Sequence, residues 1–141
     1  MEWHKGEFTI SDARARLDIA FVHEFLSNES YWARGRRVET VRRAIENSLP
    51  FGLYRGERQI GFARAVTDYA TFAWLADVFV LEEFRGHGLG VWLVETALAH
   101  PSLQNLRRWI LATRDAHALY RRFGFRAASA DFFMEKLDDG A

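Results

Sequence analysis

Apolar positions in the first fifty residues change from an extended to a helical pattern. Residues 8–11 fit a short strand. Apolar residues at helical spacing then predict one helix over residues 17–28 and a second that begins at residue 38 and ends before Pro50. A polar and aromatic loop, residues 29–36, separates the two predicted helices.

The rest of the chain predicts a sheet interrupted by helices. Three apolar runs separated by short polar turns indicate antiparallel strands over residues 51–54, 59–66 and 72–81. The pattern then predicts a helix over 88–99, a buried strand over 109–113, a helix over 115–123 and a last strand over 132–136. This order requires a mixed, mostly antiparallel sheet with helices on both faces, and therefore an α+β fold of three layers in a single domain spanning residues 1–141.

Composition narrows the function classes. The chain has 141 residues, of which 49% are hydrophobic, so a packed core is expected. The 19 basic and 19 acidic residues balance, which argues against binding to nucleic acid or to an anionic membrane by bulk charge. The absence of cysteine excludes disulfides, thiolate metal sites and a cysteine nucleophile, and no metal is expected. The first residues contain no apolar signal region, so a soluble, cytoplasmic protein is expected.

A glycine-rich turn is the most informative motif. Residues 78–81 are an apolar strand end, and Gly86, Gly88 and Gly90 follow directly before an apolar helix. Glycines leave no β-carbons in the way, so backbone N–H groups at the helix N-terminus can approach a phosphate. The turn lacks the Gly-Lys-Ser/Thr of a Walker A loop and the glycine spacing of a dinucleotide fingerprint. What remains is Arg85-x-x-Gly88-x-Gly90, for which an ordinary strand-to-helix turn is the alternative interpretation.

A second motif lies further along the chain. The predicted helix 115–123 carries Ala116, Leu119, Tyr120 and Phe123 on one face and stops at Gly124. Together, Arg85-x-x-Gly88-x-Gly90 and Ala116-x-x-x-Tyr120-x-x-x-Gly124-Phe125 resemble the two cofactor motifs of the GNAT superfamily of acetyl-CoA-dependent N-acetyltransferases. The resemblance covers residues 51–125 in order.

The resemblance implies a fold, a cofactor and a set of binding residues. In the GNAT fold, the strand before the glycine turn and the strand before the last helix separate, and the pantetheine arm of acetyl-CoA enters the gap. The implied cofactor-binding residues are Phe79 and Val80, through their backbone, and Arg85, Gly86, His87, Gly88, Leu89 and Gly90 of the pyrophosphate turn. Tyr120 matches the tyrosine that hydrogen-bonds the cofactor sulfur and protonates the departing thiolate; a core aromatic is the alternative.

Three more positions are candidates for cofactor contacts. Thr113 stands where many family members have an asparagine that bonds the pantetheine, and Asp115 is a possible substitute for it. Arg122, in a basic cluster with Arg121 and Arg126, is a candidate for the 3'-phosphate, because arginine binds phosphate in bidentate fashion. A solvated helix face is the alternative for this cluster.

Asp77 is the most suggestive ionisable residue, because its predicted strand is otherwise apolar on both faces. A buried carboxylate without a partner is costly, so it must be paired, wetted or shifted in pKa. A raised pKa would suit a catalytic general base. An ion pair with Arg58 across the predicted hairpin is the structural alternative.

The acceptor site is predicted from two loops. Tyr31, Trp32, Asp68 and Tyr69 occupy the loops that wall the acceptor site in this family, and aromatic rings beside an acid suit a cationic amine. The leading hypothesis is therefore transfer of an acetyl group from acetyl-CoA to a primary amine of a small molecule, by direct attack in a ternary complex. A protein N-acetyltransferase and a non-catalytic acyl-CoA-binding sensor are the alternatives, and a homodimer stays open.

Overall fold

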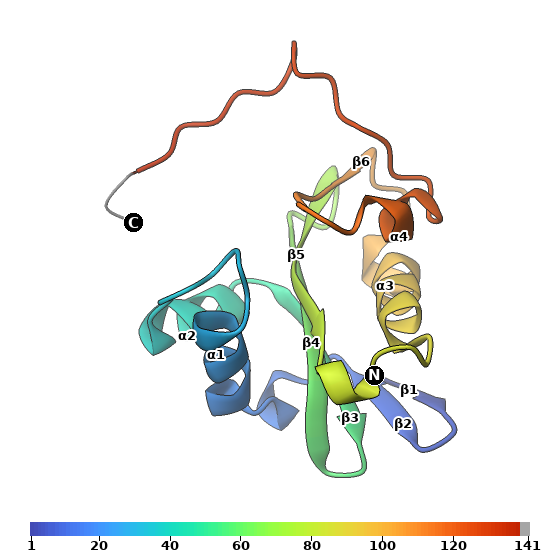
Figure 1. Cartoon of the computed structure of the whole chain (residues 1–141). Helices are drawn as coiled ribbons and strands as arrows, with labels where there is room; N and C mark the ends of the chain where they lie inside the picture. The colour runs from blue at the N-terminus through green and yellow to red at the C-terminus, as the bar shows by residue number, and fades with distance from the viewer. Residues whose placement is uncertain (139–141) are drawn as a thin grey trace.

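The computed structural model describes residues 1–138 as a six-stranded sheet with helices on both faces (Figure 1). The strands follow each other across the sheet in chain order: β1 (Glu2–Lys5), β2 (Phe8–Ser11), β3 (Leu49–Arg55), β4 (Arg58–Thr67), β5 (Phe72–Val80) and β6 (Arg108–Ile110). The α-helices are α1 (Ile19–Asn28), α2 (Val38–Glu46), α3 (Leu89–Ala99) and α4 (His117–Arg121). Neighbouring strands are antiparallel except β5 and β6, which are parallel. The predicted α+β fold with a mostly antiparallel sheet is confirmed.

Two apolar cores lie on opposite faces of the sheet. On one face, α1 and α2 contribute Val22, Phe25, Leu26, Val41 and Ile45, which pack with Phe62 and Phe79 of the sheet. On the other face, Leu89, Leu93, Val94 and Ala97 of α3 pack over Phe51, Leu53, Ile60, Ala63 and Val80. Figure 1 shows α1 and α2 on one side of the strands and α3 and α4 on the other. Helices therefore cover both faces of the central strands, which explains why the sequences of these strands are almost continuously apolar.

Short-range signals place the ends of these elements. The Asp18 carboxylate accepts a hydrogen bond from the N–H of Phe21 at 3.0 Å and caps the start of α1. Gly56 adopts φ +60° in the tight β3–β4 turn, a conformation that costs a glycine little. The predicted helices and the three central strands are confirmed within two or three residues of their expected ends.

The observed sheet differs from the prediction at three strands. The buried strand expected over 109–113 is β6, which is shorter, Arg108–Ile110, and contains no buried residue. β1 was not predicted, because Glu2–Lys5 is a polar edge strand that pairs only with β2 and has no apolar alternation. The expected last strand over residues 132–136 is absent, and the chain after α4 runs away from the body without regular structure (Figure 1). Within this segment Phe132 is 86% and Met134 98% exposed. A short apolar segment forms a strand only where it has a partner to pair with.

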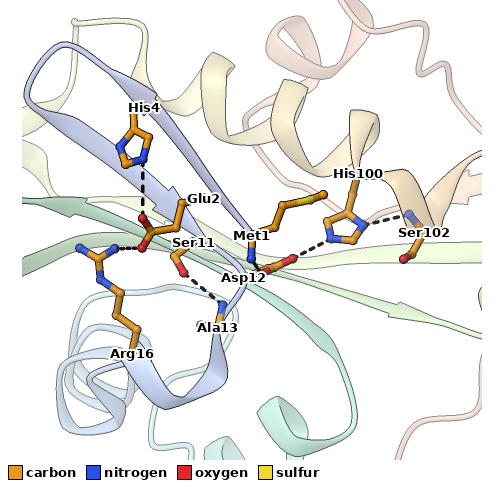
Figure 2. A network of polar contacts seen from close by, with 9 residues as sticks. All are labelled: Met1, Glu2, His4, Ser11, Asp12, Ala13, Arg16, His100 and Ser102. Carbon is orange, nitrogen blue, oxygen red and sulfur yellow. Dashed lines mark hydrogen bonds and ion pairs between the residues drawn. The ribbon is translucent and has the colours of Figure 1, made fainter.

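A polar network ties the β1–β2 hairpin to the end of α3 (Figure 2). The Asp12 carboxylate lies 2.9 Å from the ammonium group of Met1 and accepts a hydrogen bond from Nε2 of the buried His100 at 2.8 Å. His100 Nδ1 in turn accepts from the N–H of Ser102 at 3.0 Å, so the ring proton lies on Nε2. Partial burial acts to raise the pKa of Asp12, but the hydrogen bonds from Met1 and His100 outweigh it and lower the pKa. Ion pairing thus fixes the edge of the sheet against α3.

Across residues 1–138, none of the helices combines the length and the apolar character needed to cross a bilayer.

Candidate active site

The candidate site lies where β5 and β6 separate. The two strands pair only over Phe72–Trp74 and Arg108–Ile110, and the chain after Ile110 diverges from β5. A cleft of about 500 Å³ opens beside the unpaired half of β5. The cleft is lined by the strand end Val78–Val80, the glycine turn with Arg85, Gly86, Gly88, Leu89, Gly90 and Val91, the α4 region with Asp115, Ala116, Leu119 and Tyr120, and Phe25, Glu29, Ser30, Tyr31 and Trp32 from the end of α1.

The glycine turn is anchored to the sheet at its start. The N–H of Leu81 donates to the carbonyl of Ile60 at 2.9 Å, and the Arg85 guanidinium donates through Nε to the carbonyl of Val80 at 3.0 Å. Gly86 and Gly88 then adopt φ values of +83° and +76°, the left-handed region that disfavours other residues. These two turns bring the chain directly into α3, whose N-cap is Gly88.

The turn offers free donors at a helix N-terminus. Among residues 1–138, no hydrogen-bond acceptor is found for the N–H groups of residues 86–91. A β-carbon placed on Gly86, Gly88 or Gly90 would meet no atom within 4 Å, so the space in front of the backbone is open. Unsatisfied N–H groups and the positive end of the helix dipole together form a site for an anion. The phosphate cradle stays a prediction, and these open donors support it.

The edge of β5 supplies a second set of backbone groups. Because Leu81 donates to β4, the alternation of an antiparallel pair turns the N–H and carbonyl of Val80 away from β4. The carbonyl of Val80 accordingly accepts from Arg85. The same alternation turns the backbone groups of Phe79 toward β4, while its ring stacks on Phe25 with centroids 3.8 Å apart. Of the two predicted backbone contacts, Val80 is therefore the one whose donor faces the gap.

Tyr120 reaches the cleft from α4. Its side chain is buried at 8% exposure, and its ring packs edge-on against Phe125 with centroids 5.8 Å apart. Burial, together with the nearby Tyr31 and the charge of Asp115, raises the pKa of Tyr120 to about 12. The phenol therefore keeps its proton throughout the neutral range and can donate it to a group in the cleft. Tyr120 also belongs to the core on the α3 face, as the core-aromatic alternative expects. Its role toward the cofactor sulfur stays a prediction.

An aromatic pair forms the opposite wall. The rings of Tyr31 and Trp32 meet edge-to-face with centroids 5.1 Å apart. The Tyr31 hydroxyl accepts a hydrogen bond from the N–H of Arg114 at 2.8 Å, and the Arg114 guanidinium lies 3.9 Å from the ring centroid of Tyr31. The loop before α2 is thus joined to the segment between β6 and α4 across the cleft.

Asp77 sits behind this wall at a β-bulge. The register places Ala76 opposite Arg64 but Phe79 opposite Phe62, so two residues of β5 oppose one of β4. Asp77 adopts φ +52° at the bulge. The extra residue changes the side-chain phase, because Leu75 and Val80, five positions apart, pack in the same core. The strict alternation expected along this strand is therefore wrong beyond Ala76.

The Asp77 carboxylate is fully paired. Oδ2 accepts hydrogen bonds from Arg64 Nε at 2.7 Å and Arg36 Nη1 at 2.9 Å, and Oδ1 accepts from Trp32 Nε1 at 2.9 Å. Burial acts to raise the pKa of Asp77, but the two guanidinium charges and these hydrogen bonds outweigh it and lower the pKa. The predicted raised pKa is wrong, and so is the predicted partner, since Arg58 pairs with Glu83 at 2.8 Å instead.

The structure does not bring Asp68 and Tyr69 to the cleft. They lie in the β4–β5 turn, and the eight residue steps of β5 from Phe72 to Val80 span roughly 26 Å. The Asp68 carboxylate caps its own turn: the hydroxyl and N–H of Thr71 and the N–H of Ala70 donate to it, and they lower its pKa. These two residues are held by the turn rather than by the site.

Three predicted cofactor residues also lie outside the lining of the cleft. The Thr113 hydroxyl accepts from the N–H of Ala116 at 3.1 Å, ahead of α4, and Thr113 lines a separate hollow. Arg122 is exposed at the end of α4, and the His87 side chain is exposed in the glycine turn. Asp115, in contrast, does line the cleft.

Sequence reasoning missed three functional candidates. Arg36 and Arg64 hold Asp77 but stand 41 and 13 positions away from it in the chain, and no local pattern connects them. Glu29 brings an exposed carboxylate to the cleft wall from just beyond α1. The sequence feature that could have identified Glu29 as a site residue is its position at the start of the polar and aromatic loop, residues 29–36.

Comparison with known proteins agrees with this geometry. The sequence profile of the Acetyltransferase (GNAT) family matches residues 19–125, about three quarters of the chain. The chain belongs to the GNAT family of acetyltransferases. Enzymes of this family use acetyl-CoA, so the chain is an acyl-CoA-dependent acetyltransferase.

Individual relatives support the assignment of this GNAT protein. A crystal structure of a protein from Xanthomonas campestris pv. campestris assigned to the GNAT family is 44% identical, has a TM-score of 0.92 and covers 97% of each chain. A protein of Gibberella zeae assigned as an acetyltransferase is 29% identical over 84% of this chain and 78% of its own. Glucosamine-6-phosphate N-acetyltransferase from Arabidopsis thaliana, at 17% identity and a TM-score of 0.65 over 94% of this chain and 99% of its own, shares the fold alone.

The paired state of Asp77 predicts a structural phenotype. Asp77→Asn keeps the shape, and asparagine tolerates the positive φ, but two buried guanidinium groups lose their counter-charge. We expect the free energy of unfolding at pH 7 to fall by about 1–4 kcal/mol in urea denaturation, with the rate per folded molecule preserved. Because the folded pKa is lowered, this difference shrinks as the pH falls below about 4.

The exposed Glu57→Gln variant is the control and should leave the free energy of unfolding unchanged. Lost turnover with an unchanged denaturation curve would instead make Asp77 a catalytic residue.

Proposed function

We propose that this acetyltransferase transfers an acetyl group from acetyl-CoA to a primary amine of a small molecule, by direct attack within a ternary complex. The observation that carries the proposal is the convergence, in one cleft, of free backbone donors at the start of α3, a protonated tyrosine and an aromatic wall with a carboxylate. These are the groups that acyl transfer from a thioester to an amine requires.

The residues present fit the cofactor. The free N–H groups of residues 86–91 suit the pyrophosphate, and Arg85 adds a positive charge at the cleft wall. The unpaired edge of β5 at Val80 suits the amides of an extended pantetheine arm. Acetyl-CoA supplies the acetyl group as a thioester, so a C–N bond forms, the C–S bond breaks and the sulfur leaves as a thiolate.

Tyr120 would act on the leaving sulfur. Its phenol holds a proton in the neutral range, so it can donate a hydrogen bond to the sulfur as negative charge develops there. A thiol has an ordinary pKa near 8.5. Full transfer of the tyrosine proton to the thiolate is therefore uphill, and stabilisation through the hydrogen bond is the larger contribution that we propose for Tyr120.

The acceptor amine would enter on the Tyr31 and Trp32 side. Aromatic faces and the Glu29 carboxylate would attract an ammonium group. Asp77 is committed to Arg64 and Arg36, so we propose that it positions Trp32 and that the amine loses its proton to water or binds in the neutral form. A volume of about 500 Å³ lies within the range of small-molecule sites, which favours a small amine over a protein surface.

A thiol-release assay with acetyl-CoA tests the proposed function. Primary amines that raise the melting temperature in the presence of acetyl-CoA should release free thiol in proportion to acetylated amine, with parallel initial-rate kinetics for the two substrates. Turnover with peptide amines and none with small amines would show a protein acetyltransferase. Tight acetyl-CoA binding without turnover of any amine class would show a sensor.

Gly90 offers a clean test of the phosphate cradle. It lies in the first turn of α3 without a positive φ, and a β-carbon there meets nothing, so Gly90→Ala should leave the fold intact or stabilise it slightly. Gly90→Asp should raise the dissociation constant for acetyl-CoA by about tenfold or more, measured by calorimetry, because a carboxylate would face the pyrophosphate. Gly90→Ala should weaken binding less.

Ala99→Asp adds the same charge at the exposed far end of α3 and is the matched control. Equal affinity of the Gly90→Asp and Ala99→Asp variants would remove the glycine turn from the cofactor site.

Tyr120→Phe tests the proposed donor. The variant should keep the ring packing and the cofactor affinity while turnover falls by roughly a hundred- to a thousandfold, the range typical of a lost hydrogen-bond donor to developing negative charge. Steady-state kinetics over pH 6–9 measures the loss. Tyr69→Phe, which removes a hydroxyl from an exposed ring outside the cleft, is the control. If both variants turn over like the parent protein, Tyr120 is a core-packing residue only.

A further inference from the structure

The C-terminal segment, residues 129–138, begins with a turn at residues 130–132 and exposes apolar side chains. Phe132, Met134 and Leu137 are all largely exposed, and Figure 1 shows the segment leading away from the sheet beyond α4. The N–H of Phe132 donates to the carbonyl of Ser129, a contact inside the segment itself. The apolar run Phe132-Phe133-Met134, with its two aromatic residues, favours a strand, and a strand needs a partner.

The sheet ends at β6 with an edge that has room for one more strand. β6 ends the strand order and pairs only with β5, so its other edge carries unpaired backbone groups. A hollow of about 1160 Å³ runs along this edge, since residues 107–113 all line it in succession. Trp109, Leu111, Phe123 and Phe125 provide apolar surface in the hollow. The hollow exceeds the usual range of small-molecule sites.

Charge complements the apolar fit. The charged side chains that line the hollow are basic, namely Arg107, Arg108, Arg121 and Arg126, and its lining includes no carboxylate. The C-terminal segment carries Asp131, Glu135 and Asp138 against Lys136. An acidic, apolar strand and a basic, apolar hollow are thus displayed by the same chain.

The chain's own segment passes the hollow without filling it. Ser129, Phe132 and Phe133 form one wall, and the Arg108 guanidinium lies 5.1 Å from the ring centroid of Phe133. Beyond that point the segment leads outward, with Met134 almost fully exposed. A segment that leaves its own body in this direction is placed to meet the complementary edge of another molecule.

We infer that two copies of this chain exchange the ends of their C-terminal segments, and that residues 134–138 of each copy pair as a strand with the free edge of β6 in the other. A two-fold exchange satisfies both exposed segments and both hollows at once, because each copy presents the same pair of complementary surfaces. The hollow also includes Thr113, His117 and Tyr120, so the partner's segment would pack against the helix that carries Tyr120. The inference does not depend on the proposed substrate.

The oligomeric state of the full-length chain tests the exchange. Light scattering after size exclusion should give the mass of a dimer, and Met134→Glu should raise the dimer dissociation constant by about tenfold or more. Met134 is 98% exposed in the single copy, so its replacement leaves the monomer fold intact. Lys136→Gln, in the same exposed segment, is the matched control and should leave the dimer unchanged. A monomer at every concentration, or a dimer indifferent to Met134→Glu, would overturn the inference.

Cross-linking separates exchange from closure within one molecule. Because the chain has no cysteine, Arg108→Cys and Met134→Cys can be combined and treated with a flexible bis-maleimide, using a mixture of isotopically light and heavy protein. Exchange gives covalent dimers with mixed light–heavy cross-linked peptides. Links exclusively within light or within heavy chains of monomer mass would show that the segment folds back on its own β6, and would also overturn the inference.

Discussion

The buried Asp77 carboxylate at the β5 bulge is the constraint on which the candidate site depends. Three donors from three parts of the chain, Arg64 on β4 and Arg36 and Trp32 around the loop between α1 and α2, converge on its two oxygens. Removal of one partner would leave charge buried, so the network holds together as a unit. The bulge itself rotates the following residues, which sends the Phe79 ring to the α1 face and Val80 to the α3 face. The β-bulge at Asp77 thus positions both the wall formed by Tyr31 and Trp32 and the unpaired edge of β5.

The separation of β5 from β6 leaves backbone groups of β5 free to bind a ligand. A fully paired sheet would satisfy the edge of β5 with hydrogen bonds, whereas pairing that stops at Trp74 leaves the backbone near Val80 available. The glycine turn supplies a similar surface at the start of α3. Both surfaces recognise a ligand through main-chain groups, so the side chains at these positions are free to pack. This division explains why Val80 and Leu89 are apolar residues in a binding cleft.

The C-terminal end of the sheet contrasts with the N-terminal end. At the β1 end, the Asp12 carboxylate fastens the hairpin to the end of α3 through an ion pair with Met1 and a hydrogen bond from His100. At β6 the edge stays open beside a basic hollow, while an acidic, apolar segment extends from the same molecule. Exposed apolar area and an unpaired edge on one end of a sheet are typical of an interface.

Local patterns were enough to predict the helices, the three central strands, the fold class and the glycine turn, because hydrophobic period, turn residues and the spacing of Arg85, Gly88 and Gly90 are local properties. The sequence also indicated Tyr120 through a helical stripe. Tertiary structure decided the rest. The partners of Asp77 come from distant segments, so neither its low pKa nor its role behind Trp32 was readable from its strand. Asp68 and Tyr69 were expected at the site, but the length of β5 keeps their turn away from the cleft. Residues 132–136 begin with an apolar, aromatic run that favours a strand, yet a strand needs a neighbour, and pairing is a property of the assembled sheet, not of the segment.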